Sequence, residues 1–292
     1  LRFTSILFTL VSIILWYLYF IRDKYEAIVF SILIITSSFL LQETIFFRYY
    51  SYYFLTSTFT FLFLIRWIDQ FTTNQKLIFS FFGVLLSPYI FFVLNTLQYA
   101  FYFAYILLSE KIKNIKARLF FTIVPVLFIL YVIFNPALIW KTLNWINISG
   151  HGNIDMASLN IRGFTLSILI KPFYAFFQMV FGNNVAPSES FIIILLFFII
   201  SFFIVNLLYN ILCQDKKLFI KYLSIGLIPF LFIYFFLEAI SLPGFTQLET
   251  KHGMLLYPII LALVVKAPKY LSPLKSYLFI GVVFISQLIG MQ

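Results

Sequence analysis

Long apolar runs alternate with short polar or basic turns along the whole chain. A membrane-spanning helix needs about 20 consecutive apolar residues. The pattern predicts ten candidate spans, several of them short, as expected for helices that are tilted or partly covered by protein: 4–21, 26–42, 53–68, 77–94, 96–109, 119–134, 190–212, 218–240, 253–266 and 275–290. The stretch 164–182 contains Lys171-Pro172 and Gly182, and we interpret it as a helix lying at the membrane interface. The predicted fold class is therefore an all-α, polytopic transmembrane helical bundle.

Composition strengthens this interpretation. The 292 residues are 63% hydrophobic, 22% aromatic and 10% charged, whereas a soluble domain has about 25% charged residues. The single Cys213 excludes an internal disulfide and a cysteine-rich metal site. The chain starts without Met and without a signal peptide, and we expect it to be a fragment that lacks its N-terminus.

The net charge of +10 is explained by the distribution of basic residues rather than by nucleic-acid binding. Of the 20 basic residues, 14 fall in turns on one predicted face: Arg22, Lys24, Arg66, Lys76, Lys111, Lys113, Lys116, Arg118, Lys216, Lys217, Lys221, Lys266, Lys269 and Lys275. Cytoplasmic loops of membrane proteins carry such an excess of Lys and Arg. We therefore expect a multi-pass protein of a bacterial inner or plasma membrane, with this face in the cytoplasm.

The other face is expected to hold the chemistry of a single transmembrane domain, 1–292, in its outer segments 43–53, 135–189 and 241–253. Charges in the middle of the spans are almost absent, which argues against an ion-coupled transporter. The cations that could hold a phosphate are Arg48, Arg162, Lys171 and Lys251. The acids that could act as bases or hydroxyl acceptors are Glu43, Asp155, Glu189 and Glu249, and Tyr49 and Tyr50 are among the aromatic residues that could line a sugar or lipid path.

Simpler interpretations stand beside these. Tyr and Trp near a span end are common interfacial anchors, and Arg48 can extend to lipid phosphates without binding a substrate. His151 and Asp155 have i, i+4 spacing, and His252 lies on the same face. Two histidines and scattered carboxylates do not make a metal cluster, so no metal or cofactor is predicted, although a divalent cation is left open.

The order of these features resembles the C-type glycosyltransferases (GT-C), which include protein O-mannosyltransferases and aminoarabinose transferases. Gln42, Glu43, Arg48 and Tyr50 look like the family's outer motif Gln-Glu-Ala-Arg-x-Tyr, with TIFF between Glu43 and Arg48 where the family has one residue. The hairpin 87–108 resembles the family's next hairpin, with Asn95-Thr96-Leu97-Gln98-Tyr99 in place of its Thr-His-Tyr tip. KHGMLLYPIILALVV resembles a helix start in which Lys251 or His252 replaces the family's Arg and Pro258 its Pro.

The resemblance implies transfer of a sugar from a polyprenyl-phosphate donor, with inversion, to a glycan, lipid or protein acceptor at the extracytoplasmic face. It assigns Arg48, Lys251 and His252 to the donor phosphate, and Glu43, Tyr49 and Tyr50 to the sugar or lipid path. The family's catalytic Asp is expected upstream of Leu1, so no catalytic residue is assigned in this chain. The expected partners are the bilayer, the lipid-linked donor and the acceptor, with no nucleic acid.

Two other functions share these features. A polysaccharide polymerase or a ligase of lipid-linked glycans also needs an outer arginine and a long outer loop, but not the upstream carboxylate. A lipid-linked glycan flippase or transporter would need a continuous polar path across the membrane, and neither midplane charges nor inverted repeats are visible in the sequence.

Overall fold

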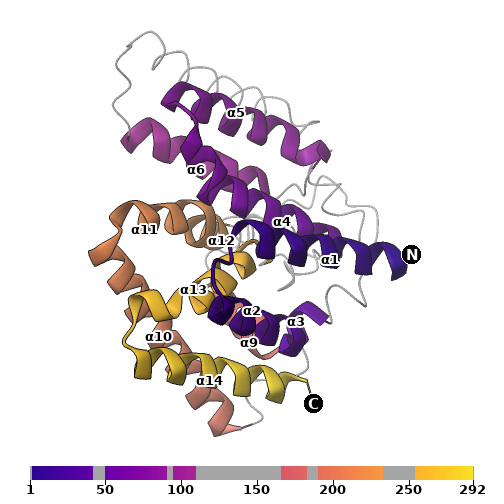
Figure 1. The fold of residues 1–292 in the computed structure, drawn as a ribbon, viewed down its shortest axis with the longest axis vertical. Helices are drawn as coiled ribbons and strands as arrows, with labels where there is room; N and C mark the ends of the chain where they lie inside the picture. The colour runs from indigo at the N-terminus through magenta and orange to yellow at the C-terminus, as the bar shows by residue number, and fades with distance from the viewer. Residues whose placement is uncertain are drawn as a thin grey trace.

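The computed structural model describes residues 2–41, 50–90, 95–109, 166–182, 190–232 and 254–291 (Figure 1). Within these ranges every regular element is a helix and there is no strand, which confirms the all-α class. The elements are α1 (Arg2–Tyr19), α2 (Lys24–Thr36), α3 (Ser38–Leu41), α4 (Tyr50–Ile65), the 3-10 turn η2 (Trp67–Gln70), α5 (Thr73–Ile90), α6 (Asn95–Ser109), α9 (Leu166–Phe181), α10 (Phe191–Gln214), α11 (Lys216–Tyr222), the π turn η5 (Leu223–Leu227), α12 (Ile228–Phe232), α13 (Tyr257–Tyr270) and α14 (Pro273–Gly290).

Most apolar runs became helices within a few residues of the expected bounds. The stretch 26–42 differs, because the helix stops at Thr36 and restarts at Ser38. Ser37 has extended backbone angles, φ −71° and ψ 96°, and its Oγ accepts a hydrogen bond from the Leu40 N–H at 3.1 Å. A serine side chain that caps the next turn competes with continuation of the helix. The run is therefore a broken helix rather than a single span.

The expected span 218–240 is helical through Phe232, where α11 runs through the π turn η5 into α12, and its last residues, 233–240, lie outside the described residues. Asp215 begins α11 by accepting a hydrogen bond from the Leu218 N–H at 3.0 Å. A π turn disturbs the regular backbone ladder, and Gln98 of α6 donates to the Ile225 carbonyl there at 2.8 Å. At Gly226 an added Cβ would overlap the Ile259 side chain, so glycine lets α13 pack closely against the turn.

Helix α13 is the core of the bundle. Residues 257–265 are buried along their whole length, and α13 packs against α2, α4, α10 and α14. Two helix pairs, α1 with α4 and α5 with α6, pack side by side on one flank (Figure 1). The C-terminal half of α9, the stretch expected to lie at the interface, packs against α3 and α14.

Helices α10 and α14 are long and apolar enough to cross a membrane. The other described helices are shorter or less apolar, and the predicted span 119–134 lies outside the described residues. Only 17% of the most apolar 18-residue stretch of α10 is buried inside the protein. The exposed side chains of this helix include Phe191, Phe198 and Phe202. The core helix of a soluble protein would be covered instead. Continuous exposed apolar surface of this kind is typical of contact with lipid or protein.

Candidate functional site

Most of the predicted site residues fall outside the part of the chain that the structure describes. These are Glu43, Arg48, Tyr49, Asp155, Arg162, Glu189, Glu249, Lys251 and His252. Tyr50 is the first residue of α4 and Lys171 lies in α9, and the side chains of both are likewise outside the described set. What the structure does describe is how the helix ends beside these residues are held together.

Several of those helix ends meet at one polar cluster, which we call the Ser37 junction: Thr36, Ser37, Ser38, Phe181, Tyr257, Gln287 and Gly290. It joins the α2–α3 break, the end of α9, the start of α13 and the end of α14. The marked chain ends N and C lie on the same side of the bundle as α3 (Figure 1).

The central contact of the junction is the hydrogen bond between Tyr257 and Ser37. Their hydroxyl oxygens lie 2.6 Å apart, although the residues are 220 positions apart in the chain. The Tyr257 ring is buried, with Phe39 at 5.4 Å and Phe54 at 6.0 Å between ring centroids. A buried hydroxyl needs a partner, and here the same serine caps α3. One contact thus fixes the start of α13 against the α2–α3 break.

A second contact ties α14 to the same break. The Thr36 hydroxyl donates to the Ile32 carbonyl at 2.8 Å, and its Oγ1 lies 2.7 Å from the side-chain amide of Gln287. Both side chains are buried. A glutamine in a buried helix face costs free energy unless its amide is hydrogen-bonded, so this pair specifies the position of α14 along α2.

The third contact requires two glycines. Ser38 donates its hydroxyl to the Phe181 carbonyl at 3.1 Å, which satisfies a carbonyl at the end of α9. At Gly290 an added Cβ would overlap that carbonyl oxygen, and at Gly182 it would overlap the Ser38 hydroxyl. Gly182 also has φ +83°, the left-handed conformation common just after a helix. The α9 and α14 ends therefore approach at backbone contact.

The junction is a scaffold and not itself a reactive site. Its polar groups are neutral hydroxyls and an amide, and they are used in bonds to one another and to backbone carbonyls. In sequence, however, it borders the three predicted outer segments: 43–53 begins just after α3, 135–189 extends past Gly182, and 241–253 precedes the first turn of α13.

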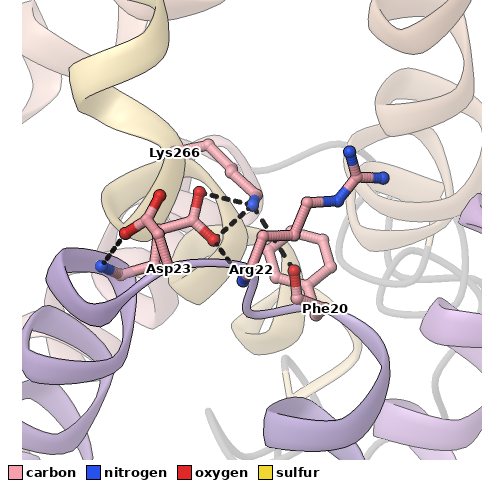
Figure 2. Close-up of polar contacts among 5 residues, drawn as sticks. Phe20, Arg22, Asp23 and Lys266 are labelled. Carbon is pink, nitrogen blue, oxygen red and sulfur yellow. Dashed lines mark hydrogen bonds and ion pairs between the residues drawn. The ribbon is translucent and has the colours of Figure 1, made fainter.

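The opposite end of the bundle carries the described ion pairs. Lys266 lies 2.6 Å from both carboxylate oxygens of Glu26, donates to the Phe20 carbonyl at 3.4 Å, and sits 4.9 Å from the Phe20 ring centroid (Figure 2). Asp23 caps α2 by accepting from the Glu26 N–H, and the Glu26 carboxylate accepts in return from the Arg22 N–H. This reciprocal arrangement resembles a capping box and fixes the carboxylate that Lys266 binds.

A second ion pair joins α11 to the turn after α4. The Lys221 ammonium lies 2.6 Å from Asp69 and 3.4 Å from the Ile65 carbonyl, and Lys217 lies 3.5 Å from the same carboxylate. Burial alone raises the pKa of Asp69. The hydrogen bond from Lys221 and the charges of Lys221, Lys217 and Lys76 outweigh burial and hold that pKa below its ordinary value of 3.8. Asp69 is therefore charged throughout the neutral range.

The sequence analysis missed both the ion pairs at one end of the bundle and the Ser37 junction at the other. It noted the basic residues of the turns but not that Glu26 and Asp69 pair with Lys266 and Lys221. The rarity of acids was the available signal, since only 10 Asp and Glu occur in the chain. Ser37 and Tyr257 carried no signal, because their meeting depends on helices distant in sequence.

The described residues contain no group of three or more His, Cys, Asp and Glu side chains that could hold a metal ion. Comparison of the chain with models of known protein families, with curated protein sequences and with solved structures gives no significant match in any of the three.

Proposed function

We propose that this chain is part of a multi-pass membrane glycosyltransferase. It moves a sugar from a polyprenyl-phosphate donor, with inversion, to a glycan, lipid or protein acceptor at the extracytoplasmic face of a bacterial inner or plasma membrane. The proposal joins the sequence resemblance to the arrangement of helix ends at the Ser37 junction.

The membrane part of the proposal is supported by surface and charge. Helices α10 and α14 have the length and composition of spans, and α10 exposes its apolar side chains. All four carboxylates among the described residues, Asp23, Glu26, Asp69 and Asp215, lie at the end of the bundle opposite the Ser37 junction. Charge confined to a helix end is what a hydrocarbon core demands.

The observation that carries the enzymatic part is the Tyr257–Ser37 hydrogen bond. It holds together two helix ends whose neighbours in sequence are the predicted phosphate ligands: Arg48 follows α3, and Lys251 and His252 precede the first turn of α13. A phosphate site whose cations are distant in sequence needs helix ends that are held rigidly together. A small displacement of a charged group greatly weakens its contribution to a reaction.

In the proposed reaction, an acceptor hydroxyl attacks the anomeric carbon of the donor sugar. The bond between that carbon and the phosphate oxygen breaks, polyprenyl phosphate leaves, and a general base takes the hydroxyl proton. Arg48, with Lys251 or His252, offsets the charge that develops on the leaving phosphate. Glu43, Tyr49 and Tyr50 line the sugar or lipid path. The general base is not assigned to a residue of this chain.

The test uses cells in which the full-length protein is replaced by variants. Arg48→Ala is compared with Arg48→Lys, which keeps the charge, and with Asn74→Ala, an exposed position at the opposite end. Lipid-linked sugars are extracted and identified by mass spectrometry, and protein abundance is followed by immunoblot. We expect Arg48→Ala to accumulate a sugar linked to polyprenyl monophosphate and to lose at least 90% of transfer, by analogy with lost transition-state donors.

Normal transfer by Arg48→Ala at normal abundance would remove Arg48 from the site. Accumulation of an oligosaccharide on polyprenyl diphosphate would replace the proposal with a polymerase or ligase. A lipid-linked glycan trapped in the cytoplasmic leaflet would replace it with a flippase. Asn74→Ala must behave as wild type for any of these conclusions.

A further inference from the structure

Four connections that are distant in sequence meet at the end of the bundle opposite the Ser37 junction, and we call this the basic end. The Tyr19 and Trp67 rings, 4.8 Å apart, join the α1–α2 turn to η2. Asp69 joins η2 to α11 through Lys221. The end of α10 meets the end of α13, because Asn210 donates to the Tyr270 carbonyl at 3.0 Å.

Each acid at the basic end is used within the protein. Glu26 is paired with Lys266, whose side chain is only 16% exposed. Asp69 is paired with Lys221, which is 2% exposed, and more weakly with Lys217. Asp23 and Asp215 accept backbone N–H groups at the starts of α2 and α11, where a negative charge is favourable.

The other exposed cations at this end form no ion pair with a carboxylate of the described residues. These are Arg22, Lys24, Arg66, Lys216, Lys269 and Lys275. Figure 2 shows the Arg22 side chain extending away from the Lys266 pair. The fold has thus paired Glu26 and Asp69 with buried or partly buried lysines, used Asp23 and Asp215 as helix caps, and left a set of exposed cations without ion pairs at one end.

Exposed apolar and aromatic side chains lie near these cations in sequence, in the same helix or in the helix next to it. Leu274 is 70% exposed and Tyr277 61% exposed, both within two residues of Lys275. Tyr209, one turn from the end of α10, is 63% exposed. Tyrosine in this position is typical of the boundary between headgroups and acyl chains.

We infer that the basic end binds the phosphate headgroups of anionic phospholipids in the leaflet that surrounds it. A phospholipid supplies both features this end lacks, a row of negative phosphates for the cations and acyl chains for the apolar side chains beside them. A nucleic acid or an acidic protein would neutralise the charge but leave that apolar surface exposed to water. This binding is independent of the proposed transferase activity, which concerns the other end.

The expected strength follows from the number of cations. Each Lys or Arg close to an anionic lipid surface strengthens binding about fivefold at moderate ionic strength, and the effect falls within a Debye length. Removing four of the six cations therefore lowers the preference for anionic over zwitterionic lipid by at least tenfold, allowing for non-additive contributions.

The experiment measures lipid binding by the full chain purified in dodecylmaltoside micelles, by energy transfer from tryptophan to dansyl-labelled lipid. Dansyl-phosphatidylglycerol is compared with dansyl-phosphatidylcholine. The test variant carries Arg22→Gln, Arg66→Gln, Lys269→Gln and Lys275→Gln together. The matched control carries Arg22→Lys, Arg66→Lys, Lys269→Arg and Lys275→Arg, which keeps every charge. Since all four side chains are exposed, both variants are expected to fold, and their melting temperatures check this.

We expect the wild type and the control to prefer phosphatidylglycerol, with a preference that falls as salt rises, and the test variant to lose it by at least tenfold. Equal binding of both lipids by the wild type, or an unchanged preference in the folded test variant, would overturn the inference. Displacement of phosphatidylglycerol by millimolar inorganic phosphate would replace it with a site for a free phosphate. Displacement by a short oligonucleotide would replace it with a nucleic-acid site.

Discussion

Asparagine in place of Asp69 tests how the basic end is held together. Asp69→Asn leaves the Lys221 ammonium almost fully buried, with the Ile65 carbonyl at 3.4 Å as its described hydrogen-bond acceptor. The reverse change, Lys221→Met, leaves a carboxylate that is 38% exposed and still has Lys217 at 3.5 Å. The two substitutions break the same ion pair, but they leave behind groups with very different access to water.

The burial of each partner gives the magnitudes. Removing one member of a buried pair costs about 3–5 kcal/mol, and we take about 3 kcal/mol for Asp69→Asn because Asp69 itself is partly hydrated. Lys221→Met costs about 1 kcal/mol, as for an exposed pair, because Asp69 stays hydrated and Met matches the apolar stem of Lys221. The double variant costs about 1 kcal/mol, so the coupling between the two positions is about 3 kcal/mol.

The assay is thermal unfolding of the purified protein in detergent. A loss of 1 kcal/mol lowers the melting temperature by about 2 °C in a chain of this size. Asp69→Asn is expected to lower it by about 6 °C, and Lys221→Met and the double variant by about 2 °C each.

The pH dependence gives an independent check on the same ion pair. The pKa of Asp69 in the folded state lies below 3.8, its value in the unfolded chain. The contribution of the carboxylate is therefore complete above that value and is lost as the pH falls through the folded pKa. The difference between wild type and Asp69→Asn should be constant between about pH 5 and pH 8 and should shrink below about pH 4.

Equal losses for the two single variants, or a double variant as unstable as Asp69→Asn, would refute the reasoning. Either result would mean that Lys221 does not depend on Asp69 for its burial. Asn74→Ala serves as the control, because Asn74 is exposed in the first turn of α5, at the same end of the bundle as Asp69. It is expected to shift the melting temperature by less than about 1 °C.

Three further predictions concern the rest of the fold. Gly290→Ala places a methyl group against the Phe181 carbonyl oxygen and should lower the free energy of unfolding by about 2–3 kcal/mol. Gly281→Ala has no atom within 4 Å of the new Cβ and should stabilise α14 by up to about 1 kcal/mol. The melting temperatures of the two variants test this, and equal effects would contradict the close approach of α9 and α14. Tyr257→Phe removes the hydrogen bond to Ser37 and should cost about 1–2 kcal/mol, and a variant as stable as wild type would show that this bond does not hold the junction. The single cysteine, Cys213, is exposed at the basic end of α10, so a membrane-impermeant maleimide should label it only after cells are permeabilised, and labelling in intact cells would reverse the proposed orientation.

The sequence by itself determined where most helices lie. Apolar runs of helical length, bounded by local signals, predicted α1, α5, α6, α10 and α14 within a few residues. Asp215 and Pro273 act at the helix starts through groups one turn away, so no distant part of the chain is needed to interpret them. The basic turns were equally visible, because charge is excluded from the middle of an apolar run.

Only the tertiary structure decided how the helices are joined. Ser37, Thr36 and Gln287 look like ordinary polar residues in the sequence, and their roles come from partners more than 200 positions away. The predicted phosphate ligands, Arg48, Lys251 and His252, lie outside the described residues, so they stay predictions that the Ser37 junction supports only through its neighbouring helix ends.

The two glycines of α14 show the physical reason. Gly281 and Gly290 have the same intrinsic effect on a helix, yet one faces open space and the other touches the α9 backbone. Helix propensity and capping act within one turn, so a sequence carries them directly. Close packing and ion pairing depend on which surfaces meet, and that is fixed only when the whole bundle assembles.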